Sequence, residues 1–130
     1  MNIPADLKYT KTDEWVKVEG KVGTIGITDY AQNQLSDIVF VEIPVGVGEA
    51  LKKGTTCGTI ESVKAAADVN APVSGTVTAV NEDLPNAPEQ LNSDPFGKAW
   101  LLKVELSNLS ELENMLDAAA YEAYCQERDH

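Results

Sequence analysis

Short β-prone runs separated by turn residues constrain the fold of this chain more than any other feature of its sequence. Runs at 14–20, 22–27 and 38–43 are rich in branched and aromatic residues, and glycine or proline marks their boundaries. Strands of this length, spaced by turns, predict a small antiparallel barrel or sandwich. We therefore expect a mainly β fold with short helices and a C-terminal helical segment over about residues 108–126.

Local patterns refine this expectation. Residues 14–27 predict a hairpin with its turn at 19–21, and residues 29–37 predict a short helix with Thr28 or Asp29 as its N-cap. The loop 81–97 is long, and we expect its apolar side chains to hold it against the protein. Those side chains are Leu84, Leu91 and Phe96.

The C-terminal segment carries helix signals of its own. Ser110 and Glu113 have the spacing of a capping box, and Asp117 is placed to cap a second short helix. Four apolar residues fall on one predicted helical face. They are Leu109, Leu112, Leu116 and Ala120.

Length and charge limit the possible functions. A chain of 130 residues predicts one domain spanning 1–130. A net charge of −11 repels nucleic-acid backbones, and it favours solubility and attraction to partners with basic faces. No apolar run approaches the ~20 residues needed to span a bilayer, so we expect no membrane partner. The N-terminus lacks the pattern of a signal or transit peptide, which predicts a cytoplasmic protein, or a mitochondrial one only if a transit peptide has been removed.

Residue types that carry catalysis are scarce. The single histidine is His130, the last residue, so the sequence predicts neither a histidine-dependent nucleophile nor a histidine-containing metal site. General base chemistry by a carboxylate stays open. Cys57 and Cys125 could form one disulfide, but the sequence favours two separate thiols. We expect a protein that performs no catalysis and binds no metal.

The stretch "TIESVKAAADV" (59–69) predicts a hairpin with a lysine at its tip. A two-residue loop at Lys64-Ala65 would place Glu61 opposite Asp68, and like charges in that position are unfavourable. Neither loop residue suits the positive φ of tight hairpin turns. An exposed lysine surrounded by alanines suits covalent modification, although an ordinary solvated lysine is the alternative.

The segments "ESVKAAADV" and "APVSGTV" resemble the lipoyl-lysine region of glycine cleavage system H proteins. The resemblance continues through "LKYTKTDEWVKVEG", "VGTIGITDYAQNQLSDIVFVEIP", "LNSDPFGKAWLLKVEL" and "LDAAAYEAY", in family order. It implies a lipoyl-domain-like flattened β-barrel, or barrel-sandwich hybrid, in which Lys64 carries lipoate through an amide bond. It also implies a cleft for the loaded arm, with Glu14, Thr12 and Asp68 as candidate contacts to the arm's cationic amine. We expect Trp15 to form an apolar wall beside Glu14.

The resemblance implies a carrier whose chemistry belongs to its cofactor and partner enzymes. The aminomethyl group of glycine would pass from a pyridoxal-phosphate decarboxylase to a folate-dependent aminomethyltransferase. Dihydrolipoamide dehydrogenase would reoxidise the arm, and lipoate-attaching enzymes would load Lys64. A transient shuttle of this kind is expected to be a monomer.

The sequence departs from the family pattern at three positions. Asp13 stands where the family often has His, Ser36 where it often has Gly, and Ala67 where it often has Ser. The first departure is expected to add a negative charge near the cleft, and the other two to be conservative.

Three other functions stay open at this stage. The chain could be a lipoyl relay or regulatory homologue that serves another complex. A biotinyl-type carrier has a similar barrel, but its tip resembles Met-Lys-Met, whereas Val63 and Ala65 flank the lysine here. An unmodified acidic interaction module is what remains if Lys64 is bare in cells.

Overall fold

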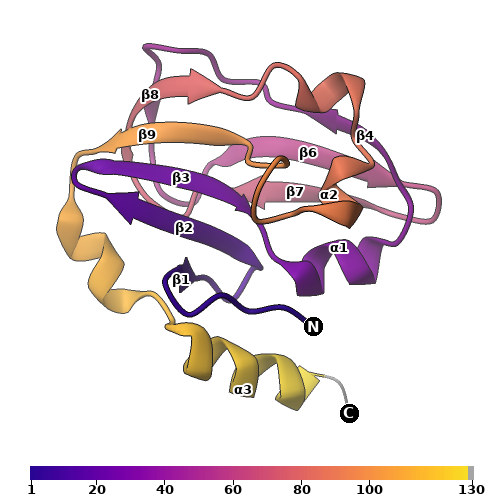
Figure 1. Cartoon of the computed structure of the whole chain (residues 1–130). Helices are drawn as coiled ribbons and strands as arrows, with labels where there is room; N and C mark the ends of the chain where they lie inside the picture. The colour runs from indigo at the N-terminus through magenta and orange to yellow at the C-terminus, as the bar shows by residue number, and fades with distance from the viewer. Residues whose placement is uncertain (129–130) are drawn as a thin grey trace.

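A computed structural model describes residues 1–128, and in them the strands form two antiparallel sheets (Figure 1). The larger sheet has the strand order β1-β2-β3-β9-β8-β5. Its strands are β1 (Lys8–Tyr9), β2 (Glu14–Glu19), β3 (Val22–Ile27), β5 (Ala50–Leu51), β8 (Gly75–Val80) and β9 (Leu102–Leu106).

The smaller sheet has the order β4-β6-β7 and ends in the hairpin tip at the right of Figure 1. Its strands are β4 (Ile38–Glu42), β6 (Thr56–Ser62) and β7 (Ala66–Asn70). Ile25 and Val104 from the larger sheet share one buried core with Val41 and Ile60 from the smaller one. The mainly β fold of two antiparallel sheets with short helices agrees with the predicted barrel-sandwich architecture.

The predicted β2–β3 hairpin and the helix after it are confirmed. Glu19 pairs with Val22, and Gly20 takes a φ of 63° in the turn between them. Helix α1 (Asp29–Leu35) begins after Thr28, whose hydroxyl accepts a hydrogen bond from the Ala31 N–H at 3.2 Å.

The loop after β8 is held down as predicted. Leu84, in the 3₁₀ helix η1 (Leu84–Asn86), and Leu91, in helix α2 (Gln90–Ser93), are fully buried. Phe96 packs against Trp15 with ring centroids 5.9 Å apart. Each apolar anchor offsets part of the entropy cost of ordering this segment.

The C-terminal segment differs from its prediction in two respects. Asn108, not Ser110, caps the 3₁₀ helix η2 (Leu109–Asn114), because the Asn108 side-chain oxygen accepts the Ser110 N–H at 3.2 Å. The chain is then extended at Leu116, which exchanges two backbone hydrogen bonds of 2.8 Å with Tyr9. This bridge breaks the continuous apolar face that the leucine spacing predicts.

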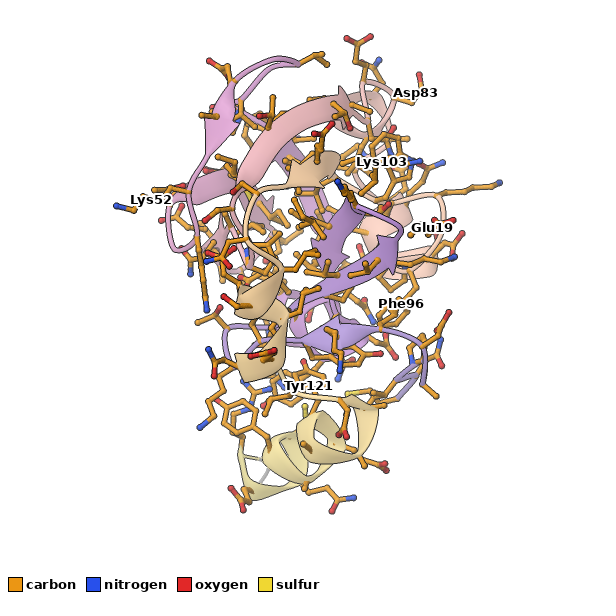
Figure 2. The ribbon with its side chains drawn as sticks, turned by 90° about the vertical axis from the view of Figure 1, so that its left-hand side faces the viewer. Glu19, Lys52, Asp83, Phe96, Lys103 and Tyr121 are labelled. Carbon is orange, nitrogen blue, oxygen red and sulfur yellow. The ribbon has the colours of Figure 1, made fainter. Side chains whose placement is uncertain are left out.

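Helix α3 (Ala118–Arg128) follows the bridge, and its predicted cap is confirmed. The Asp117 carboxylate accepts the Ala120 N–H at 2.8 Å. Tyr121 stacks on Tyr9 with ring centroids 4.7 Å apart and planes 9° apart. Figure 2 shows Tyr121 between α3 and the strands, so this helix covers a second, smaller core.

Cys57 and Cys125 are both buried and free, as the sequence favours. Within residues 1–128, no helix is both long and apolar enough to cross a membrane. His130 lies outside the described residues.

Candidate functional site

Lys64 is exposed at the tip of the β6–β7 hairpin, but the predicted register of that hairpin is wrong. Glu61 pairs with Ala66, and the Ser62 N–H donates to the Ala65 carbonyl at 2.7 Å. The two-residue tip is therefore Val63-Lys64, and the predicted tip Lys64-Ala65 is displaced by one residue.

Contacts of the tip residues explain this register. The Ser62 hydroxyl accepts the Ala65 N–H at 3.1 Å, which closes the turn with a side chain. The Val63 N–H donates to the Asp37 carbonyl at 3.0 Å, which ties the tip to the start of β4. Both contacts require Val63 to lie inside the tip.

The predicted opposition of Glu61 and Asp68 is absent in this register. Asp68 pairs with Thr59, and the Thr59 hydroxyl donates a hydrogen bond to the Asp68 carboxylate at 3.5 Å. The hairpin therefore avoids a facing pair of like charges, and Asp68 is available on the exposed edge strand β7.

A pocket of about 180 Å³ lies between the two sheets next to α1. Its floor and walls are mostly apolar, and its polar groups gather at the β1–β2 turn and on β7. The pocket is lined by Thr12, Asp13, Glu14, Ile27, Ala31, Gln34, Leu35, Ile60, Ala67, Asp68 and Val69. The structure thus brings together the three predicted cleft residues, Thr12, Glu14 and Asp68.

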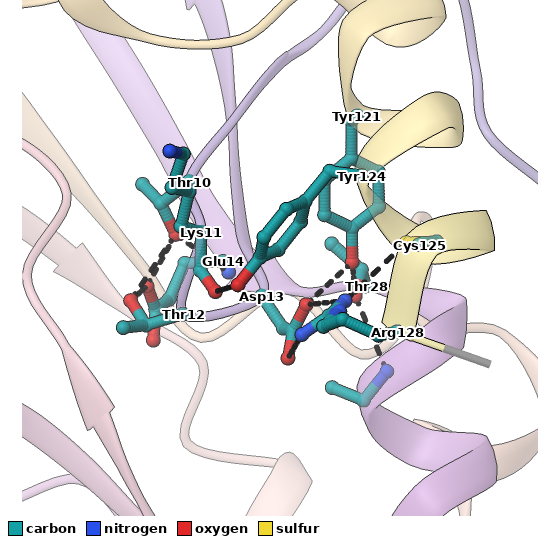
Figure 3. A network of polar contacts seen from close by, with 11 residues as sticks. Thr10, Lys11, Thr12, Asp13, Glu14, Thr28, Tyr121, Tyr124, Cys125 and Arg128 are labelled. Atoms are coloured by element: carbon teal, nitrogen blue, oxygen red, sulfur yellow. Dashed lines mark hydrogen bonds and ion pairs between the residues drawn. The ribbon is translucent and has the colours of Figure 1, made fainter. Parts of the chain in front are cut away.

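Glu14 is the buried polar group of this pocket, with only 2% of its surface exposed. Its Oε1 accepts hydrogen bonds from the hydroxyls of Thr10 at 2.6 Å and Thr12 at 2.5 Å, shown as dashed lines in Figure 3. Its Oε2 accepts the Asn70 N–H at 3.2 Å. A carboxylate offers about four lone-pair positions, so one acceptor position of Glu14 has no donor among residues 1–128.

Burial raises the pKa of Glu14 above its ordinary value, because desolvation disfavours the charged form. The hydrogen bonds from Thr10, Thr12 and Asn70 act in the opposite direction. A cation entering the pocket would restore the lost solvation of this carboxylate. The arrangement is therefore suited to binding a small ammonium group.

Trp15 does not form the predicted wall of the pocket. Its ring lies against Gly26, where an added Cβ would be 2.5 Å from the ring atoms, and its Nε1 donates to the Pro95 carbonyl at 3.1 Å. Neighbouring residues of a strand point to opposite faces, so Trp15 enters the smaller core while Glu14 faces the pocket. The apolar wall comes instead from Ile27, Leu35 and Ile60.

Two of the departures from the family pattern have structural consequences that sequence reasoning missed. Asp13 lines the pocket, and its negative charge raises the pKa of Glu14, as the sequence leads us to expect; its ion pair with Arg128 at 2.7 Å, which offsets part of that charge, was not foreseen. Ser36 ends α1 with φ 64° and ψ −142°, a backbone conformation that favours glycine. The expectation that this second change is conservative is wrong.

Lys64 itself does not line the pocket, but it lies on the hairpin that does. Asp68 follows it by four residues, of which the last three lie in β7 (Ala66–Asn70), so the two Cα atoms are at most about 14 Å apart. About eleven single bonds separate the Cα of a lipoyl-lysine from its dithiolane ring, and an extended chain advances roughly 1.2 Å per bond, or about 13 Å in all. An arm on Lys64 that folds back along β7 can therefore reach the pocket.

Comparison with known proteins gives a consistent result. The family model for the glycine cleavage H-protein matches residues 7–128. The chain is 58% identical to the glycine cleavage system H protein of Acidobacterium capsulatum, over 98% of this chain and 97% of the relative. It is 48% identical to a mitochondrial glycine cleavage system H protein 2 of Arabidopsis thaliana, over 95% of this chain and 79% of the relative.

A solved structure agrees with these relatives. The crystal structure of a glycine cleavage system H protein from Mycobacterium marinum superimposes with a TM-score of 0.84 at 33% identity. It covers 98% of this chain and 100% of that chain.

Proposed function

This chain belongs to the glycine cleavage H-protein family, and on that premise we propose that Lys64 is the residue that carries its lipoyl group. Family members are lipoyl-carrying shuttle components of the glycine cleavage system and not its catalysts, and this chain is such a carrier. The exposure of Lys64 on a two-residue tip supports the assignment, because an attaching enzyme can enclose a side chain that projects from the protein.

The pocket is proposed as the resting place of the loaded arm. The lipoyl group, when attached, supplies the sulfur that bears the aminomethyl group of glycine. Glu14 would accept a hydrogen bond from the ammonium through its remaining acceptor position, and Asp68 and the Thr12 oxygen would complete the contacts. Ile27, Leu35 and Ile60 would keep water from the rest of the arm. The single observation that carries this proposal is a buried carboxylate with an unfilled acceptor position, within reach of Lys64.

The system's other components are the carrier's partners. We propose the pyridoxal-phosphate decarboxylase, the folate-dependent aminomethyltransferase, dihydrolipoamide dehydrogenase and the lipoate-attaching enzymes as the proteins it meets. We further propose that the chain works as one monomeric domain in the cytoplasm, or in the mitochondrial matrix if a transit peptide has been removed.

Mass spectrometry of the protein from its native host tests the attachment site. We expect a lipoyl increment on the peptide that contains Lys64 and no increment on the peptide that contains Lys52 and Lys53. An unmodified Lys64 under lipoate-replete conditions would overturn the assignment, and a biotin increment would select the biotinyl-type carrier. Reconstituted glycine–bicarbonate exchange with the decarboxylase separates the shuttle from a lipoyl relay.

The rate at which the loaded arm loses its aminomethyl group tests the pocket. Glu14→Gln keeps the shape of the side chain and removes its charge, so we expect a roughly tenfold or faster loss, the worth of one charge-assisted hydrogen bond. Glu19→Gln, at the far exposed end of the same strand, is the matched control. Equal rates in the wild type and in Glu14→Gln would remove Glu14 from the site.

A further inference from the structure

Three side chains of α3 form hydrogen bonds with the β1–β2 turn, which contains the pocket residue Thr12. Tyr121, Tyr124 and Arg128 are spaced three and four residues apart, so they share one face of the helix. Figure 3 shows all three directed toward the β1–β2 turn. We call this set of three residues the α3 latch.

Asp13 is the main contact of the latch. Arg128 Nη2 donates to Asp13 Oδ1 at 2.7 Å, and Nη1 donates to Oδ2 at 3.1 Å, in the paired geometry that makes such ion pairs strong. The two side chains are only 24% and 18% exposed, so solvent screens them incompletely. Asp13 takes a φ of 74°, and these bonds fix the orientation of its side chain in that conformation.

A directed chain of hydrogen bonds reaches the same carboxylate from α1. The Ala31 N–H donates to the Thr28 hydroxyl oxygen at 3.2 Å, and the Thr28 hydroxyl lies 2.6 Å from that of Tyr121. Tyr121 donates its proton to Asp13 Oδ1 at 2.8 Å, so Thr28 is the donor to Tyr121. The donors all point toward Asp13, an arrangement in which each bond strengthens the next.

The latch holds the residues on both sides of Thr12. The Tyr124 hydroxyl donates to the Lys11 carbonyl at 3.1 Å, while Arg128 and Tyr121 hold Asp13. The Arg128 guanidinium also lies over the ring of Tyr30 on α1, 3.9 Å from its centroid. Arg128 therefore connects two walls of the pocket, the β1–β2 turn and α1.

We propose that Arg128 is a positioning residue that, through Asp13, holds the Thr12 hydroxyl on Glu14 and so keeps the pocket preorganised for the ammonium group. The inference rests on the proposed function of the pocket. Arg128 does not touch the arm; it acts through the turn. A latch with only a structural role would stabilise the protein and leave the Thr12–Glu14 contact unchanged.

Titration of Glu14 in the unlipoylated protein tests the latch without the cofactor. Thr12→Val removes a hydrogen bond that favours the charged form of Glu14, so the Glu14 pKa should rise further. Carboxyl-detected NMR follows this pKa, and the size of the rise is the reference for the other variants. Arg128→Met should produce at least half of that shift, and Arg128→Lys, which keeps the charge without the paired bonds, a smaller one. Lys103→Met is the matched control, because Lys103 also lies over an aromatic ring, that of Trp100.

Asp13→Asn is a second route to the same result. Asparagine tolerates the positive φ and still accepts from Tyr121, so this variant should fold. It loses the ion pair and also the Asp13 charge, which by itself raises the Glu14 pKa. Combining Arg128→Met with Thr12→Val separates positioning from the Asp13 charge, because an effect that acts through Thr12 disappears in the Thr12→Val background and a purely electrostatic effect does not. An unchanged Glu14 pKa in Arg128→Met, or an equal rise in the wild-type and Thr12→Val backgrounds, would overturn the proposal, whatever happens to the melting temperature.

Loss of the aminomethyl group from the loaded protein separates this proposal from the one it rests on. If Thr12→Val and Arg128→Met both speed the loss several-fold while Lys103→Met does not, both proposals are supported. If Thr12→Val speeds it and Arg128→Met does not, the latch proposal fails alone. If Glu14→Gln and Thr12→Val both leave the rate of loss unchanged, the pocket proposal fails, and the latch proposal that rests on it fails with it.

Discussion

At the scale of single residues, Glu14 shows a conflict between stability and ligand binding. Its carboxylate is buried among three hydrogen-bond donors, and burial still raises its pKa. Water would solvate the charge better than this site does. The residue is therefore suited to an ammonium ligand at the expense of the empty protein's stability.

The stability of Glu14→Gln relative to the wild type should rise as the pH rises toward neutral in the unlipoylated protein, on top of a constant cost, because the Gln NH2 cannot accept the hydrogen bonds that the carboxylate accepts. Because the Glu14 pKa is raised in the folded state, the native protein binds the proton more tightly than the unfolded chain does. The free energy of unfolding therefore falls as the pH rises from about 4 through the raised pKa, and is constant above it.

Urea unfolding at a series of pH values measures this difference. The stability of Glu14→Gln relative to the wild type should be highest at neutral pH and fall as the pH approaches 4, while Glu19→Gln shows no such trend. A gap that does not change with pH would contradict this account of Glu14.

Ser36→Gly should also stabilise the protein, for a reason confined to the backbone. Ser36 is exposed and has φ 64°, ψ −142°, a conformation in which a Cβ is strained. Relief of that strain should exceed the added entropy of glycine in the unfolded chain, and we expect a net gain of about 1 kcal/mol. Ser107→Gly, at another exposed loop serine, is the control and should be neutral or slightly destabilising. A loss of stability in Ser36→Gly would show that Ser36 is not strained.

At the scale of elements, the C-terminal segment depends on one cap. The Asp117 carboxylate accepts the Ala120 N–H at 2.8 Å directly after the Tyr9–Leu116 bridge. This cap sets where α3 begins. Asp117→Ala should cost about 1 kcal/mol of unfolding free energy, as lost N-caps do. Glu122→Ala, on the exposed face of the same helix, should stay within about 0.5 kcal/mol of the wild type. Equal effects in thermal melts would mean that the cap contributes nothing.

The elements also show what sequence could and could not provide. Hydrophobic alternation and turn residues predict the β2–β3 hairpin and α1 correctly, because those signals are local. The register at Lys64 depends on the Val63–Asp37 contact with another strand, and no local pattern contains that information. The cap at Asn108 was missed because Ser110 and Glu113 match a known motif equally well.

The candidate site, like the fold, could be predicted from the sequence only in part. Thr12, Glu14 and Asp68 were predicted from family resemblance, and the structure places all three around one pocket. Residues that hold the β1–β2 turn without lining the pocket match no sequence motif, so Arg128 was missed. The spacing of Tyr121, Tyr124 and Arg128 on one helical face was the available signal, but the leucines of the same segment gave a stronger one.

At the scale of the whole molecule, the net charge of −11 should govern the encounter with partner enzymes. If those partners present basic faces, raising the salt concentration from ~0.05 M to ~0.5 M should reduce kcat/KM for arm loading several-fold. If the loaded arm rests in the proposed pocket, loss of the aminomethyl group without any partner should change little with salt, which makes it the internal control. A loading rate that is independent of salt would exclude electrostatic steering.

The two buried thiols have a consequence for a carrier whose cofactor is itself a dithiol. Burial raises the pKa of Cys57 to about 12, and the negative charge of Glu14 adds to the effect. Thiol–disulfide exchange requires an accessible thiolate, and Cys57 and Cys125 are both fully buried. A lipoyl arm on this protein could therefore cycle between its oxidised and reduced forms without forming mixed disulfides with Cys57 or Cys125, and all thiol–disulfide exchange would take place at the cofactor.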